Sequence, residues 1–188
     1  IREYICNFIM STLETNLIQP STGTTLTVGA SGDTVTAPTG VTIAGAMAST
    51  PSFYVKLSGD QDVSGSSHVK ITWDSEVFDT DSAFASNKFT VPTGEGGKYF
   101  FHHRCAVDDL DDGEFAQLNL YKNGSEQSNY LITTRSAHAS FTLAVQASGL
   151  IDLSAGDYLE SYIYQSSSGT QHVESANSFF AAYKLIGV

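Results

Sequence analysis

Short runs in which hydrophobic and polar residues alternate fill the chain from Pro51 to Val188. Because successive side chains of a strand point to opposite faces, this pattern predicts strands that are buried on one face. Clusters of Gly, Ser, Pro and Asp separate the runs, and no stretch keeps a helical periodicity. Besides two strands within 97–124, the pattern predicts strands near 52–57, 68–73, 77–84, 88–92, 130–135, 141–147, 158–164 and 179–186. This many antiparallel strands in one domain predicts an all-β fold, an antiparallel β-sandwich of the jelly-roll type.

The stretch Gly97–Gly124 contains a strand pattern that is dense in aromatic residues. The run Tyr99-Phe100-Phe101 opens it, an acidic loop interrupts it, and Asn123-Gly124 closes it. Asn and Gly tolerate positive φ, so a tight turn is expected at this pair. The sequence predicts a hairpin whose two strands are joined by the acidic loop.

The first fifty residues differ from the rest in composition. Residues 1–9 are apolar and precede a Met-Ser-Thr that suits a natural start, so we interpret them as a lead that need not be native. Residues 10–50 consist of short alternating pieces rich in Thr, Gly and Ser. Two interpretations stay open for them: a flexible linker, or an attachment shaft in which several copies bury residues such as Leu26 and Val28 between them. Residues 51–188 then form a head domain.

The bulk composition excludes several functions. The formal net charge of −11 over 188 residues argues against binding nucleic-acid phosphates or an anionic membrane by electrostatics. No apolar run reaches the roughly 18 residues that span a bilayer, so no membrane insertion is expected. Cys105 falls in an apolar strand pattern, and we interpret it as a core residue rather than a disulfide partner.

No catalytic constellation is recognisable in the sequence. His102 and His103 are adjacent, so in a strand they point to opposite faces and cannot bind one metal together. Neither an HExxH pattern, a paired-Cys pattern nor a nucleophile-elbow signature occurs. We therefore predict that the protein is not an enzyme and needs no cofactor.

The acidic loop is the sharpest local feature, with aspartates at Asp108, Asp109, Asp111 and Asp112. These carboxylates repel one another unless they are solvated or bind a hard cation such as Ca²⁺. The spacing lacks the twelve-residue EF-hand pattern. A solvated loop is the favoured interpretation, and a calcium site is the alternative.

Four short motifs in the compact domain resemble the C1q-like (C1q/TNF-type) globular head. They are Phe89 followed by Pro92 and Gly97-Lys98-Tyr99-Phe100-Phe101, then Leu120-Tyr121-Lys122-Asn123-Gly124, then Ala155-Gly156-Asp157, and lastly Phe180-Ala181-Ala182-Tyr183. The resemblance covers about Pro51 to Val188. It departs from the family in the extra residues Thr93–Gly96 and in Ala182, where the family has a Gly. It implies a ten-strand jelly roll, assembly as a homotrimer, and recognition or adhesion rather than catalysis.

Two further phrases, Pro20–Asp33 and Phe78–Phe84, are similar to predicted virion proteins of marine tailed bacteriophages. In such proteins the head ends a short fibre or appendage. This resemblance implies a location on the surface of a virion.

Some strands are apolar on both faces, which is unusual for a sandwich strand with one solvated face. The run 179–186 is the clearest example, and either a loop of the same chain or a second subunit could cover its outer face. We favour subunit packing and expect a trimer interface that includes Tyr99, Phe101, Tyr162, Phe179, Phe180 and Tyr183. For the outward tyrosines near Tyr162, ligand recognition stays open beside the trimer seam.

The polar segment after Tyr164 is the candidate receptor loop, because exposed loops on a rigid scaffold commonly contact partners. Its candidate contacts are Ser166, Ser168, Thr170, Gln171 and His172.

The expected function is that of a trimeric virion protein. Its head binds a host-surface glycan or protein receptor, and residues 10–50 contact other virion proteins. A capsid decoration protein that contacts only virion proteins is the main alternative. A secreted cellular C1q-like ligand is the second.

Overall fold

The computed structural model describes residues 34, 39 and 50–186, so the predicted divisions 1–9 and 10–50 lie almost wholly outside the described residues. The strands of the described head are β1 (Ser52–Lys56), β2 (Gln61–Ser64), β3 (His68–Lys70), β4 (Ser75–Asp79), β5 (Phe84–Ala85), β6 (Lys88–Thr90), β7 (Gly97–Leu110), β8 (Phe115–Lys122), β9 (Ser125–Glu126), β10 (Ile132–Arg135), β11 (Phe141–Leu153), β12 (Tyr158–Gln165), β13 (Thr170–Val173) and β14 (Phe179–Lys184). Two single 3₁₀ turns, Ser128–Tyr130 and Ser175–Asn177, interrupt them. No helix in this part of the chain is long and apolar enough to cross a membrane.

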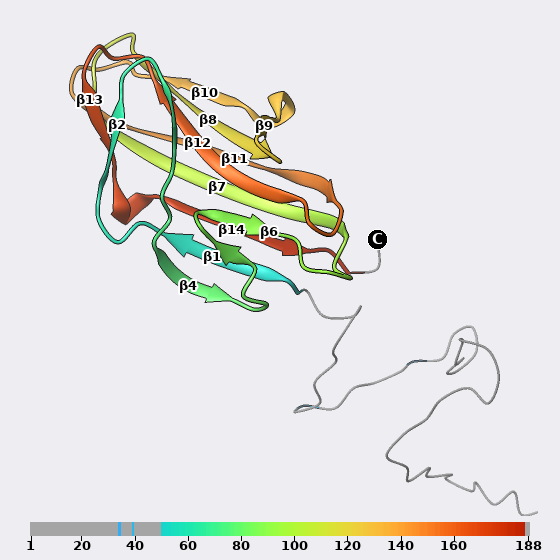
Figure 1. The fold of residues 1–188 in the computed structure, drawn as a ribbon. Helices are drawn as coiled ribbons and strands as arrows, with labels where there is room; N and C mark the ends of the chain where they lie inside the picture. Colours follow the sequence, from blue (N-terminus) through green and yellow to red (C-terminus); the bar gives the residue numbers. More distant parts are fainter. Residues whose placement is uncertain (1–33, 35–38, 40–49, 187–188) are drawn as a thin grey trace, which may run out of the picture. The chain divides into compact units, whose positions relative to one another are not determined.

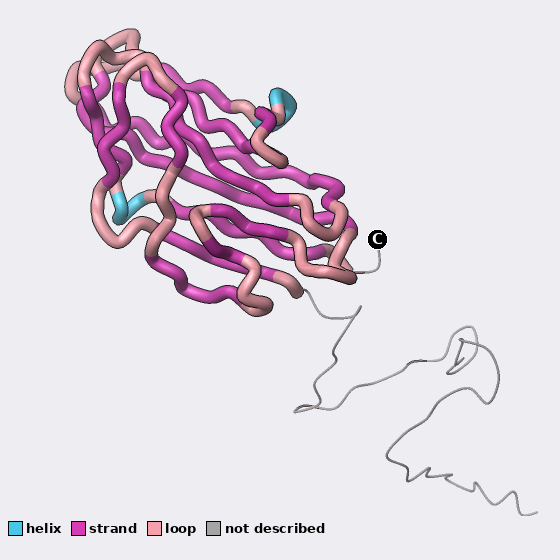
Figure 2. Tube along the Cα trace, in the orientation of Figure 1, coloured by secondary structure: helices cyan, strands magenta, loops and turns pink. Residues whose placement is uncertain are grey.

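Two antiparallel sheets form the sandwich (Figures 1 and 2). Sheet A has the order β2-β13-β7-β14-β1-β4, with β11 paired to the other edge of β7. Sheet B has the order β10-β8-β12-β6-β5, with β3 on β12 and β9 on β8. The predicted fold class, an antiparallel β-sandwich, is confirmed.

The predicted hairpin of Gly97–Gly124 is wrong. Strands β7 and β8 follow each other in the chain, but β7 belongs to sheet A and β8 to sheet B. Both strands carry complete inward-facing apolar sets, which include Phe101 and Val107 on β7 and Leu118 and Leu120 on β8. Because both sets are buried, the two strands line opposite walls of the core instead of lying side by side. The acidic loop is therefore a corner between the sheets.

The turn predicted at Asn123-Gly124 is confirmed. Asn123 has φ 54° and Gly124 has φ 76°. Lys122 pairs with Ser125 across this two-residue turn, which joins β8 to the short strand β9. Two successive positive φ values match the twist of a tight hairpin.

Three of the described strands lie outside the predicted ranges: β2, β13 and the two-residue β9. Strands β2 and β13 lie between the predicted runs, and they pair with each other along Gln61–Ser64 and Thr170–Val173. Each has one fully buried apolar residue, Val63 and Val173. A four-residue edge strand with one inward side chain has too few positions to show an alternation.

The core between the sheets is dominated by aromatic rings. Phe53 stacks on Phe89 with ring centroids 4.8 Å apart and meets Phe180 edge-on at 5.0 Å. Cys105 is buried and free, as the sequence predicted. Burial raises the pKa of its thiol, so the sulfur is a neutral core group.

One polar contact joins the two sheets through the core. His103 of β7 is fully buried, and its Nδ1 lies 2.8 Å from Oγ of Ser161 on β12. Burial, with a smaller contribution from His102, lowers the pKa of His103 to about 3, so the ring is neutral at neutral pH. The two adjacent histidines point to opposite faces, as predicted, because His102 lies partly exposed on the other side of sheet A.

Candidate interaction surfaces

Three of the residues predicted for a subunit interface belong to the core instead. Tyr99, Phe101 and Phe180 have no exposed surface in the single chain. The ring of Tyr99, for example, lies 5.6 Å from that of Phe89 between the sheets. The prediction is wrong for these three residues, because a side chain buried within one chain has no surface left for another. Only the outward members of the two-faced strands can meet a partner.

The outward side chains of sheet A form a continuous surface, which we call the sheet A aromatic face. Its members are Tyr54, Phe78, Phe100, His102, Leu150, Phe179 and Tyr183. Phe78 is 47% exposed, Leu150 57% and Tyr183 43%. The predicted interface residues Phe179 and Tyr183 lie here.

Strand register builds this face in rows across the sheet. Phe100 of β7 lies between Leu150 of β11 and Tyr183 of β14, with the rings of Phe100 and Tyr183 5.5 Å apart. In the next row Tyr54 of β1 pairs with Phe78 of β4, and their rings are 6.2 Å apart. Apolar groups that are far apart in the sequence thus become one patch.

Phe179 packs against two other members of the sheet A aromatic face, and Arg104 and Lys56 flank it in the strand register. Its ring lies 4.8 Å from His102 and 5.6 Å from Tyr54, both in edge-on arrangements. Burial, and secondarily the charge of Arg104, lower the pKa of His102. The imidazole is therefore neutral at neutral pH, and the face keeps its apolar character.

Sheet B also carries outward aromatic side chains, which we call the sheet B tyrosine face. Its members are Phe115, Tyr121, Tyr158, Tyr162 and Tyr164. Tyr162, which the sequence analysis placed in the trimer interface, belongs to this face. The predicted interface residues thus divide between the core and two outer faces on opposite sides of the sandwich.

The four aspartates of the acidic loop do not converge on a metal site. The carboxylate of Asp108 accepts a hydrogen bond from the backbone N–H of His172 at 2.8 Å. That of Asp111 accepts one from the N–H of Ser140 at 3.3 Å. Among the described residues, which include Asp109 and Asp112, no group of three or more His, Cys, Asp or Glu side chains could hold a metal ion. The calcium alternative is not supported by this arrangement.

The candidate receptor loop is shorter and more ordered than predicted. Thr170, Gln171 and His172 belong to β13, so they form part of sheet A and not of a loop. Ser166 bonds to Phe115 through both its backbone N–H, at 3.0 Å, and its Oγ, at 2.8 Å. Of the five candidate contacts, Ser168, Thr170 and His172 are exposed. Their contact with a receptor remains a prediction.

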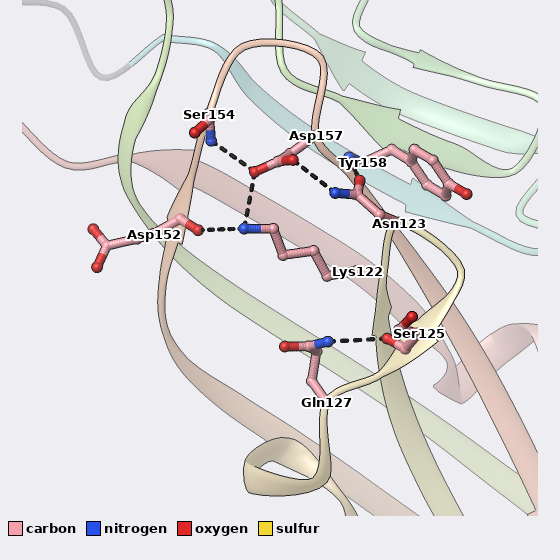
Figure 3. Close-up of polar contacts among 8 residues, drawn as sticks. All are labelled: Lys122, Asn123, Ser125, Gln127, Asp152, Ser154, Asp157 and Tyr158. Atoms are coloured by element: carbon pink, nitrogen blue, oxygen red, sulfur yellow. Dashed lines mark hydrogen bonds and ion pairs between the residues drawn. The ribbon is translucent and has the colours of Figure 1, made fainter.

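The Lys-Asn-Gly and Gly-Asp motifs meet in a polar cluster at one end of the sandwich (Figure 3). The carboxylate of Asp157 accepts from Asn123 Nδ2 at 2.7 Å, pairs with Lys122 Nζ at 2.8 Å, and accepts from the N–H of Ser154 at 2.8 Å. Asn123 Oδ1 in turn accepts from the N–H of Tyr158 at 2.9 Å. These bonds tie the β8–β9 turn to the β11–β12 turn, which gives both motifs a structural role.

This cluster perturbs the titration of its central carboxyl group. Hydrogen bonds from Lys122, Asn123 and Ser154, in that order of effect, lower the pKa of Asp157 to about 2. The carboxylate therefore stays charged through the whole range in which most acidic side chains titrate.

Tyr54, Phe78 and Leu150 are surface residues that sequence analysis did not single out. Tyr54 alternates with Phe53 and Val55, so its outward direction was readable from the sequence. Its neighbours were not, because they depend on the pairing of β1 with β14 and β4.

Comparison with known proteins shows a relationship of fold. No protein-family profile matches the sequence, and no curated protein matches it. Among solved structures, the chain is similar to the globular domain of zebrafish complement 1qA protein, with TM-score 0.51 and 16% identity over 72% of this chain and 98% of that one. It is also similar to Eiger TNF from S. frugiperda, with TM-score 0.52 and 17% identity over 73% and 92% of the two chains. Murine APRIL gives TM-score 0.51 and 12% identity over 71% and 98%.

The head therefore has the C1q/TNF-like jelly-roll fold. Identities this low establish the fold alone, which agrees with the two antiparallel sheets described above.

Proposed function

We propose that this chain is a homotrimeric recognition protein of a virion, a fibre or appendage whose head binds a receptor on the host surface and performs no catalysis. In this proposal the sheet A aromatic face is the surface through which the subunits associate. Residues 10–50 attach the head to other virion proteins. The trimer and the virion location also draw on the sequence resemblances described above.

The exposed apolar area of sheet A carries the proposal. Large aromatic side chains have about 150–250 Å² of surface each. At their exposed fractions, Phe78, Leu150 and Tyr183 together leave roughly 300 Å² in water. At about 25 cal/mol per Å², burying this area contributes roughly 7 kcal/mol per subunit before the costs of association are subtracted. The largest apolar patch of a typical monomer covers about 300–600 Å² and is often a functional surface.

The native mass of the full chain tests the assembly. Light scattering is expected to give three times the chain mass of 20.1 kDa. Phe179→Asp places a carboxylate within the sheet A aromatic face and is expected to yield monomers. Tyr162→Asp, a matched change on sheet B, should leave the trimer intact. A monomeric wild type, or a trimer lost only in Tyr162→Asp, would refute the assignment of the interface.

A secreted cellular ligand is the second candidate function. It is favoured by the similarity in fold to the complement 1qA globular domain and to Eiger TNF. Electron microscopy of virions with a labelled antibody separates the candidates. Label at tail or fibre tips supports receptor binding, an even coat on the capsid indicates a decoration protein, and unlabelled virions exclude both virion roles.

A further inference from the structure

The sheet B tyrosine face is organised as two aromatic pairs with polar side chains beside them. Phe115 and Tyr164 lie nearly parallel, with an interplanar angle of 22° and ring centroids 5.8 Å apart. His68 extends this stack on one side, 5.2 Å from Tyr164, and the Arg135 guanidinium covers Phe115 at 5.3 Å on the other. The row crosses four strands of sheet B.

The second stack joins Tyr121 of β8 to Tyr162 of β12, whose ring centroids are 4.1 Å apart. Burial is the main cause that raises the pKa of both phenols, so both are neutral hydroxyl groups at physiological pH. Beside them, Lys70 Nζ pairs with Glu160 Oε1 at 2.6 Å. The sheet B tyrosine face thus combines aromatic rings that carry neutral hydroxyls with a neighbouring Lys–Glu ion pair.

An unsatisfied amide lies within this face. Asn119 is directly opposite Tyr162 in the register, and it points away from the core because its neighbours Leu118 and Leu120 point into it. The side chain has no exposed surface, and neither of its amide atoms has a hydrogen-bond partner. A buried polar group without a partner has lost its hydrogen bonds to water and gained none in return, which destabilises the folded state. A ligand that offers both a donor and an acceptor here would remove that cost.

We propose that the sheet B tyrosine face binds an oligosaccharide. One face of a sugar ring consists of C–H groups, whose partly positive hydrogens suit the negative face of an aromatic ring. The hydroxyl groups around the sugar ring both donate and accept hydrogen bonds. The Phe115–Tyr164 stack takes the C–H face, and hydroxyls reach Asn119 when the Tyr121 and Tyr162 rings shift. This inference rests on the proposed receptor-binding function and assigns it a ligand class and a face.

A second copy of the chain is a poorer occupant for this face than for sheet A. The ion pair of Lys70 with Glu160 would have to be buried, and buried charges lose solvation that a subunit interface rarely restores. The members of the sheet A aromatic face form no ion pair, and the charges nearest to them, Lys56 and Arg104, lie in the row of Phe179 at one margin of the face. The two faces therefore suit different partners, subunits on sheet A and a polar, ring-shaped ligand on sheet B.

The test uses the full chain on a microarray of bacterial lipopolysaccharides and capsular polysaccharides. Oligosaccharides prepared from the spots that bind are then titrated by calorimetry. Tyr164→Ala is expected to weaken binding at least tenfold. Asn119→Leu should do the same while leaving the melting temperature equal or higher, because it removes an unpaired amide. A purely structural Asn119 would change stability and leave affinity alone.

Phe141→Ala is the matched control, because Phe141 is 49% exposed and belongs to β11 of sheet A, away from the sheet B tyrosine face. Its affinity should equal that of the wild type. Wild-type protein that binds no spot, or binding that survives both Tyr164→Ala and Asn119→Leu, overturns the inference.

Binding to whole cells separates this inference from the proposed function. Labelled protein that binds bacterial cells is expected to lose its target after periodate oxidation of the cell-surface glycans. Loss after protease treatment alone would refute the oligosaccharide and leave receptor binding in place. No binding to any strain of a broad panel would refute receptor binding itself.

Discussion

Replacing Asp157 by Asn is expected to destabilise the head by an amount that depends on pH. The carboxylate of Asp157 joins Lys122, Asn123 and Ser154 in one cluster, with bonds of 2.7–2.8 Å. Its side chain keeps only 17% of its surface in solvent, so water screens these bonds weakly. The substitution keeps the shape of the side chain and removes its charge.

The magnitude follows from the lowered pKa. A fall from the model-peptide value of 3.8 to about 2 corresponds to about 2 kcal/mol of stability at pH 7. Because the folded-state pKa lies below the unfolded one, this contribution is complete above pH 3.8 and is lost as pH falls towards 2. About half of it should remain near pH 3.

Urea unfolding of wild type and Asp157→Asn at a fixed protein concentration, between pH 7 and pH 2.5, measures the difference. Asp152→Asn is the control, because Asp152 contributes only its backbone carbonyl, which accepts from Lys122 Nζ at 2.9 Å. That variant should match the wild type. A difference of about 2 kcal/mol for Asp157→Asn that stayed constant down to pH 2.5 would show that the lost charge is not its cause.

Two further predictions concern other parts of the head. Burial lowers the pKa of His103 to about 3, below the unfolded value of 6.5. The free energy of unfolding should therefore fall as pH drops from 6.5 towards 3, by up to about 1.4 kcal/mol per pH unit. His103→Gln should flatten this slope, and an unchanged slope in urea unfolding would contradict the assignment. A Cβ added at Gly65 would lie 2.1 Å from the backbone oxygen of Ser167, so Gly65→Ala should lower the melting temperature by several degrees and displace the β12–β13 loop. Calorimetry and the amide NMR shift of Ser167 would detect these changes. Gly59→Ala is the control, because Gly59 is exposed and a Cβ there would meet open space.

Periodicity alone predicted the class of fold and most strands, because burial on one face leaves a period of two in each run. It did not predict which strands pair. Gly97–Gly124 looked like a hairpin because its two strands are adjacent in the chain. In the structure the apolar sides of the two strands face each other across the core, so the strands belong to different sheets. The assignment of strands to sheets depends on contacts between distant segments, which no local pattern contains.

The interface prediction shows the same limit at single residues. The pattern of β14 revealed that both faces are apolar, and Phe179 and Tyr183 do lie outward. It did not tell which of two adjacent phenylalanines points inward, and Phe180 is the buried one. The sheet A aromatic face draws on β1, β4, β7, β11 and β14 together, so it emerges only when all five strands are in register.

The position of Ser52 beside Tyr183 has a mechanical consequence. The chain enters the head at β1 at the same end where β14 leaves it, and the β7–β8 corner lies at the opposite end (Figure 1). A pull between the entry point and that far end runs along the strands. Such a load shears the hydrogen bonds of β1 with β14 and β4 all at once, instead of opening them one after another. The domain therefore resists unfolding best when force is applied along its strands.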